Sequence, residues 1–243
     1  MNSPFDPDAP SLGLGQLWDR AVTAQAAPEF WVAAAMGVVA LAIVMWRPVW
    51  RVSRHPVTIA HEASHGVVAL VSGRRLSGIR LHSDTSGVTV SRGHPRGAGM
   101  VFTCLAGYLG PSAIGLAAAA TVHAGYITAL LYGMLVLLAL MLIQIRNWFG
   151  LWSVFTTGAV IFFVTWLAPV AVHSAFAALI AWFLLLAAPR AVYDLVRARR
   201  GGRERDSDAD QLARLTHLPA FFWLGTFWLI TAAVLVCGGS LLL

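Results

Sequence analysis

Two histidines and a glutamate stand together in "AHEASHG", inside an otherwise apolar run that covers 57–72. They are His61, Glu62 and His65, and their spacing is H-E-x-x-H. Residues four apart on a helix share one face, so the two imidazoles could bind a single Zn²⁺. Glu62 could then take a proton from water activated by the zinc.

Chance is a poor explanation for this motif. A chain with eight histidines and three glutamates should contain H-E-x-x-H by coincidence roughly 0.003 times. A structural Glu–His pair inside a helix bundle is the other alternative. An ionisable residue within an apolar segment is, however, a functional candidate by default, and we therefore interpret the motif as a metallopeptidase site.

A catalytic zinc normally has a third protein ligand, which the motif does not supply. Acidic residues are scarce: beyond residue 29 they are Glu62, Asp84, Asp194, Glu204, Asp206, Asp208 and Asp210. Asp84 lies in "SDTSG", where turn chemistry alone explains an aspartate. The search for the third ligand therefore concentrates on Asp194 and Asp208.

Asp194 is the first candidate for the third ligand and Asp208 is the alternative. Asp194 ends an apolar run in "PRAVYDLVRARR", and it could instead pair with Arg190 or Arg197 at helical spacing. Asp208, in "DSDADQLARL", could instead cap the helix that follows, as Ser207 also could. Sequence reasoning leaves these alternatives open.

Asn147, in "QIRNWFG", is a candidate for contacting the substrate. Its amide could donate a hydrogen bond to a substrate backbone or to a developing oxyanion. It could equally cap the helix that follows it.

These residues belong to a chain that is built for a lipid bilayer. Of its 243 residues, 58% are hydrophobic and only 12% are charged, and the mean hydropathy is +0.71. The formal net charge is +6, and the arginines that produce it stand in short segments between apolar runs. Such charge orients membrane proteins, so we predict a bilayer environment and no nucleic-acid partner.

Six apolar runs approach the length of about 20 residues that crosses a bilayer. They cover 30–46, 100–122, 126–145, 151–167, 170–188 and 218–242. The run that carries the motif is too short for an ordinary span. The sequence thus predicts an all-α polytopic membrane protein with about six transmembrane helices plus a short HExxH helix.

One segment departs from this helical pattern. "LSGIRLHSDTSGVTVSRG" alternates apolar and polar residues on both sides of "DTSG", which predicts a β-hairpin insert over 76–93. A hairpin in a membrane protein must lie in the interface or in a protein-lined cavity. Beside the HExxH helix it could pair with an extended substrate as an added strand.

The predicted organisation is a flexible N-terminal tail over 1–29 and a membrane domain over 30–243, with a cytoplasmic Arg-rich loop over 190–216. Two spans separate each of the three basic loops from the next, so the loops share one side, which the positive-inside rule makes cytoplasmic. The HExxH run has arginines on both flanks, including Arg54 and Arg74, so we expect a re-entrant or tilted helix. The expected location is a bacterial cell membrane.

Three stretches together resemble the site-2-protease family of intramembrane zinc metallopeptidases. They are "AHEASHGVVALVSG", the β-patterned "GIRLHSDTSGVTVSRG" and "LAGYLGP". Within that family the chain is similar to a compact branch described as B-like, through "RNW" at 146–148, "YDL" at 193–195 and "SDA" at 207–209. The resemblance covers roughly 30–240.

The resemblance implies that His61 and His65 bind zinc and that Glu62 is the catalytic base. Better-known members take the third ligand from an "L-D-G" motif on the second span after HExxH, but no Asp-Gly pair occurs in this chain. The third ligand therefore rests on Asp194 or Asp208 by elimination. If neither served, the chain would be an inactive relative.

We therefore expect an intramembrane zinc metalloendopeptidase that hydrolyses peptide bonds of membrane-embedded or membrane-adjacent protein substrates. The rival is a catalytically inactive scaffold or a metal-handling membrane protein of the same fold. A transporter would be expected to show an internal repeat or more polar residues along several spans. The sequence shows no repeat, and the span interiors are nearly free of ionisable residues. The sequence leaves the oligomeric state open.

Overall fold

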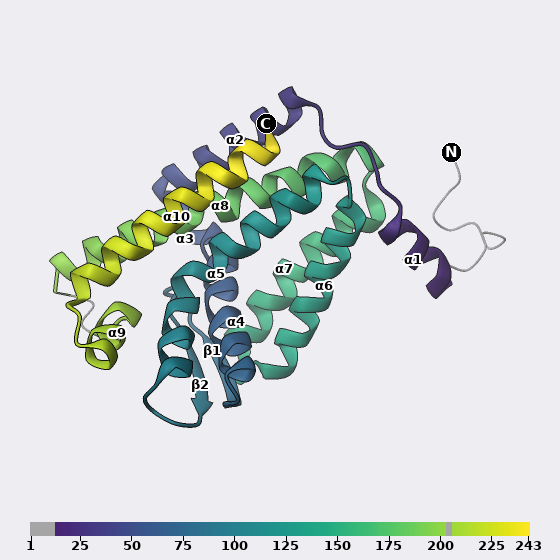
Figure 1. Cartoon of the computed structure of the whole chain (residues 1–243). Helices are drawn as coiled ribbons and strands as arrows, with labels where there is room; N and C mark the ends of the chain where they lie inside the picture. The colour runs from purple at the N-terminus through teal and green to yellow at the C-terminus, as the bar shows by residue number, and fades with distance from the viewer. Residues whose placement is uncertain (1–12, 203–205) are drawn as a thin grey trace.

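The computed structural model describes residues 13–202 and 206–243, which form helices and one two-stranded sheet (Figure 1). In chain order the elements are α1 (Leu14–Val22), α2 (Phe30–Met45), α3 (Arg47–Ser53), α4 (His55–Val71), β1 (Arg75–Leu81), β2 (Gly87–Arg92), α5 (Ala98–His123), α6 (Ile127–Gln144), α7 (Trp148–Leu167), α8 (Val170–Arg200), α9 (Asp208–Thr216) and α10 (Ala220–Leu242).

Five of these helices are long and apolar enough to cross a membrane, namely α5, α6, α7, α8 and α10. A sixth span is possible where α2 and α3 form a pair bent by 97°. Pro48 explains the bend, because it has no N–H to donate to Val44 and its ring clashes with that carbonyl. The predicted polytopic helical fold is confirmed.

Helix α4 carries the H-E-x-x-H motif and is the short helix that the sequence predicts. Its 17 residues extend about 25 Å at 1.5 Å per residue, less than the roughly 30 Å of a bilayer core. The helix begins just after α3, and Pro56 lies in its first turn. It packs against α5 on one side and against the hairpin on another.

The predicted hairpin is also confirmed. Strands β1 and β2 pair antiparallel, with Ile79 opposite Thr89 and Leu81 opposite Gly87. In the turn, the Asp84 carboxylate accepts hydrogen bonds from the hydroxyl of Ser86 at 2.7 Å and from its backbone N–H at 2.9 Å. These bonds hold the pKa of Asp84 below its usual range.

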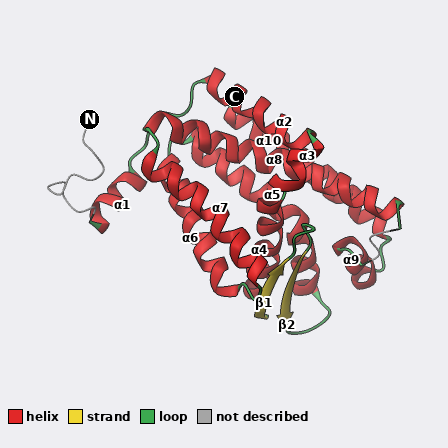
Figure 2. Ribbon diagram, turned by 180° about the vertical axis from the view of Figure 1, so that it is seen from behind, coloured by secondary structure: helices red, strands yellow, loops and turns green. Residues whose placement is uncertain are grey.

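Helix α9 lies at the same end of the molecule as the hairpin, and α1 lies at the opposite end, as both Figure 1 and Figure 2 show. The buried contacts that hold α9 come from its own Ala209 and Leu212, together with Cys104 on α5 and Phe227 on α10. Apolar packing between residues far apart in the sequence therefore fixes α9 beside α5, the helix that packs against α4.

Helix also forms within the segments that the sequence assigns to an N-terminal tail and to an Arg-rich loop. Helix α1 lies within the predicted N-terminal tail, of which 1–12 is outside the described residues. The Arg-rich segment 190–216 consists largely of the end of α8 and the whole of α9.

Candidate metal centre

Three side chains from two distant parts of the chain converge beside α4. The Nε2 atoms of His61 and His65 lie 3.1 Å apart. Each also lies 3.3 Å from Oδ2 of Asp208, at the start of α9. Among the residues that the structure describes, these three form the group of histidine and carboxylate atoms that could hold a metal ion.

The spacing of these atoms fits a zinc ion. Ligand atoms about 2.0–2.1 Å from zinc at tetrahedral angles lie about 3.3 Å from one another. The three observed separations, 3.1, 3.3 and 3.3 Å, match that edge length. Oδ2 of Asp208 is buried and makes no hydrogen bond among the described residues, so its lone pairs are available to a cation.

The tautomer of His65 also suits a metal ligand. Its Nδ1 lies 2.6 Å from the backbone carbonyl of Thr103. A carbonyl can only accept a hydrogen bond, so Nδ1 must carry the proton, and in the neutral imidazole Nε2 then presents its lone pair. This is the arrangement in which an outer partner orients a metal-binding histidine.

Asp208 is held in place by its own helix terminus. Ser207 is the N-cap of α9, and Asp210 accepts hydrogen bonds from the backbone N–H of Ser207 at 3.0 Å and from its hydroxyl at 2.6 Å. Arg199, near the end of α8, pairs with the same Asp210 carboxylate. These contacts fix the first turn of α9 and therefore the position of the Asp208 side chain.

The environment of Asp208 favours its ionised form. Burial alone would raise the pKa of this carboxyl, but the positive charge of the facing imidazoles of His65 and His61 in their protonated form outweighs burial and lowers the pKa below its usual range. The helix dipole also favours an anion in the first turn of α9. A carboxylate, which is the form that binds metal, is therefore the form expected at neutral pH.

Helix α5 comes unusually close to both histidines. A Cβ atom at Gly107 would lie 2.4 Å from Nε2 of His65 and 2.6 Å from Cε1 of His61, so any other residue there would displace the two rings. The next residue, Tyr108, packs edge-on against His61 at 4.8 Å between ring centroids and stacks on Phe227 of α10. The small residues of "LAGYLGP" thus make room for the site.

The Glu62 side chain contacts β2. The residue is only 4% exposed. Its Oε2 accepts a hydrogen bond of 2.7 Å from the hydroxyl of Thr89. A Cβ atom at Gly87 would lie 2.6 Å from Oε1, so the hairpin backbone touches the carboxylate directly.

Asp194, the first candidate for the third ligand, lies in a different cluster. Its Oδ2 accepts a 2.7 Å hydrogen bond from the indole N–H of Trp50 and lies 4.0 Å from Arg54. Its Oδ1 lies 3.3 Å from Nε of Arg190. This is the ion pair at helical i,i+4 spacing that the sequence analysis gives as the alternative to metal binding. The structure therefore brings Asp208, and not Asp194, to the two histidines.

Asn147 lies at the outer edge of the hairpin. It occupies the N-cap position of α7 without a side-chain cap, and its amide pairs with β1. The amide nitrogen donates to the Leu81 carbonyl at 2.7 Å, and the amide oxygen accepts from the Leu81 N–H at 3.1 Å. The amide nitrogen and the amide oxygen of Asn147, which the sequence analysis proposes for substrate contact, are therefore both hydrogen-bonded to β1.

A sequence profile of the Peptidase M50B-like family matches residues 34–239 of this chain. The match spans all of the elements that build the site. The chain belongs to the Peptidase M50B-like family. This family is the site-2-protease family, so the resemblance drawn from the motifs is confirmed. Neither the curated proteins nor the solved structures include a match.

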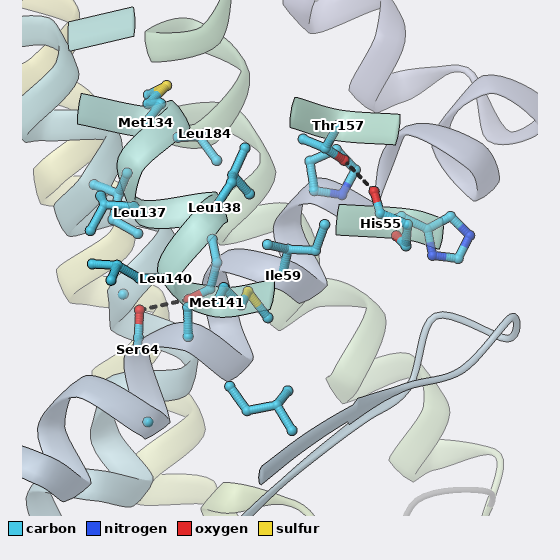
Figure 3. Close-up of a pocket in the computed structure, with 18 of the residues that line it drawn as sticks. His55, Ile59, Ser64, Met134, Leu137, Leu138, Leu140, Met141, Thr157 and Leu184 are labelled. Atoms are coloured by element: carbon cyan, nitrogen blue, oxygen red, sulfur yellow. Dashed lines mark hydrogen bonds between the residues drawn. The ribbon is translucent and has the colours of Figure 1, made fainter. Parts of the chain in front are cut away.

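A large cavity of this M50B-like chain is separate from the ligand cluster. It measures about 1230 Å³ and is lined mainly by apolar side chains of α4 to α8. In the close-up, Ile59 and Ser64 of α4 line it opposite Leu138 and Met141 of α6 (Figure 3). His61, Glu62 and His65 do not line it, whereas Ala63 and Ser64 between them do, so it lies on another face of α4.

Proposed function

We propose that this chain is an intramembrane zinc metalloendopeptidase. One observation carries the proposal: the two histidines of α4 and the Asp208 carboxylate of α9 converge at the spacing of a tetrahedral zinc site, and α4 also carries the buried Glu62. The membership in the M50B-like family supports it. The substrates would be proteins with peptide bonds within the membrane or beside it.

In this proposal His61, His65 and Asp208 hold the ion. Zn²⁺ supplies Lewis acidity when bound and lowers the pKa of a water molecule to about 7. Glu62 accepts the proton of the water whose oxygen attacks the carbonyl carbon, and it delivers that proton to the leaving amide nitrogen. The C–N bond breaks, one water is consumed, and the products are a carboxylate and an amine.

The site would lie near the cytoplasmic face in this scheme. The hairpin, the turn that contains Arg146 and the last turns of α8 are at one end of the spans and carry many of the arginines (Figure 1). Positive charge marks the cytoplasmic side of a membrane protein. This sidedness is part of the proposal, and cysteine labelling from either side of sealed vesicles tests it.

The free edge of the hairpin is the place where an extended substrate would pair. The backbone carbonyl of Ile79 accepts from the N–H of Arg146 at 2.9 Å, so Ile79 faces away from β2. In an antiparallel pair the residue opposite it, Thr89, then also faces outward. The N–H and C=O groups of Gly87 and Thr89 consequently line the open edge of β2. Alternation along the strand places the N–H of Ser91 there as well, whereas its carbonyl oxygen lies 3.5 Å from the Arg74 guanidinium.

A proline at this edge is expected to weaken cleavage. Ser91→Pro removes an outward N–H without removing a hydrogen bond of the hairpin. We expect KM for a model transmembrane substrate to rise by about tenfold, the effect of one lost hydrogen bond of about 1.4 kcal/mol. Ser91→Ala is the control for the hydroxyl that Arg74 contacts. Equal KM values in Ser91→Pro and wild type would reject strand addition.

The proposed function is tested with the purified wild-type chain in detergent. We expect about one zinc per chain by elemental analysis, and cleavage of a membrane-anchored model substrate that stops when a chelator removes the metal and resumes when zinc is restored. A chain that binds zinc at this site but cleaves none of a panel of substrates would support the inactive scaffold instead.

A further inference from the structure

Thr89 is the one hairpin side chain, among the described residues, that donates a hydrogen bond to the glutamate of the motif. Its hydroxyl lies 2.7 Å from Oε2 of Glu62 and 3.0 Å from the backbone carbonyl of the same residue. Thr89 follows Glu62 by 27 positions. Only the fold of the hairpin brings the two residues together, so no local sequence motif predicts the contact.

The hairpin confines the Glu62 carboxylate from two sides. Thr89 binds one oxygen, and the backbone at Gly87 lies so close to the other that a Cβ atom there would be 2.6 Å from it. A glutamate side chain has three rotatable bonds, and a hydrogen bond to an ionised oxygen is among the stronger restraints on it. The orientation of Glu62 therefore depends on the position of β2.

The backbone of Thr89 points in a different direction from its side chain. Its N–H and C=O point to the open edge of β2, where the proposed substrate strand would pair, whereas its hydroxyl reaches α4. One residue thus contacts the base through its hydroxyl and would contact the substrate through its main chain.

We propose that Thr89 is a positioning residue that orients the Glu62 carboxylate and links it to the strand that receives the substrate. The inference rests on the proposed function, because it assigns Glu62 the role of base. It adds a residue that the H-E-x-x-H motif does not contain, and it predicts that the hairpin contributes to the rate of the chemical step as well as to binding.

Thr89→Val tests this proposal because valine keeps the shape of threonine and removes the hydroxyl. We expect kcat to fall by about ten- to hundredfold, as for the loss of other partners that orient a catalytic site, while KM and zinc content stay near the wild-type values. Thr89→Ser restores the hydroxyl and should recover most of kcat.

Thr58→Val is the matched control. The hydroxyl of Thr58 also joins α4 to the hairpin, through a 3.0 Å hydrogen bond to the carbonyl of Thr85, but it does not contact Glu62. If Thr89 only docked the hairpin, both valine variants would lower kcat alike. Equal losses, or a kcat of Thr89→Val that equals the wild-type value, would overturn the proposal.

A second measurement does not depend on cleavage. Infrared difference spectra of protein with isotope-labelled glutamate, with Glu62→Gln as the reference that identifies the band, report the hydrogen bonding of this carboxylate. We expect Thr89→Val to shift the asymmetric carboxylate stretch of Glu62 and Thr58→Val to leave it in place. If the band shifts in Thr89→Val but the wild-type chain cleaves no substrate, the proposed function is rejected and the Thr89–Glu62 hydrogen bond is supported. If the band does not shift, the Thr89–Glu62 hydrogen bond is rejected.

Discussion

Replacing Glu62 by glutamine is expected to lower cleavage by about 10²–10⁴-fold, the range that a positioned acid–base group contributes. Glutamine keeps the shape of the side chain and can still accept a hydrogen bond from Thr89, but it cannot take a proton from water. The zinc content should stay that of the wild type, because Glu62 is not a member of the ligand group. Cleavage rates and elemental analysis on the same preparations measure both quantities.

Glu62→Ala provides the comparison for this variant. It removes the buried carboxylate and its hydrogen bond together, so it should lose activity to the same extent and some stability in addition. Loss of zinc from both variants would assign Glu62 to the metal instead. Retained activity in Glu62→Gln would remove the base from the proposed reaction.

The parts of the site that follow local patterns were predictable from sequence. His61, Glu62 and His65 are fixed by one turn of helix, and the hairpin follows from alternation around a turn that Asp84 stabilises. The spans follow from hydropathy. Each of these patterns acts within about 20 residues, where secondary structure alone decides which side chains are neighbours.

The third carboxylate depends on contacts that no local pattern encodes. The i,i+4 spacing of Arg190 and Asp194 was visible in the sequence, but the indole of Trp50, which completes that cluster, is 144 positions away. The position of Asp208 depends on α9 packing against α5 and α10. Thr89 was missed for the same reason, because its contact with Glu62 requires the hairpin to fold back on α4.

Replacing Asp208 by alanine is expected to weaken zinc binding by at least about 100-fold, since even the loss of an outer partner costs about 10- to 100-fold in metal affinity. The variant should be purified with far less than one zinc per chain and should not cleave. The reason is geometric: Oδ2 of Asp208 lies 3.3 Å from each imidazole nitrogen, and two histidines alone leave the ion without its third protein ligand.

Asp194→Ala is the matched variant, because it removes the other candidate carboxylate. It should keep its zinc, since Asp194 contacts Trp50, Arg54 and Arg190 rather than the histidines. It should lower the stability by about 1–3 kcal/mol, the cost of leaving a buried donor without its acceptor, because Trp50 is only 3% exposed. Thermal unfolding in detergent measures that loss. Zinc lost from Asp194→Ala and kept by Asp208→Ala would reverse the assignment of the third ligand.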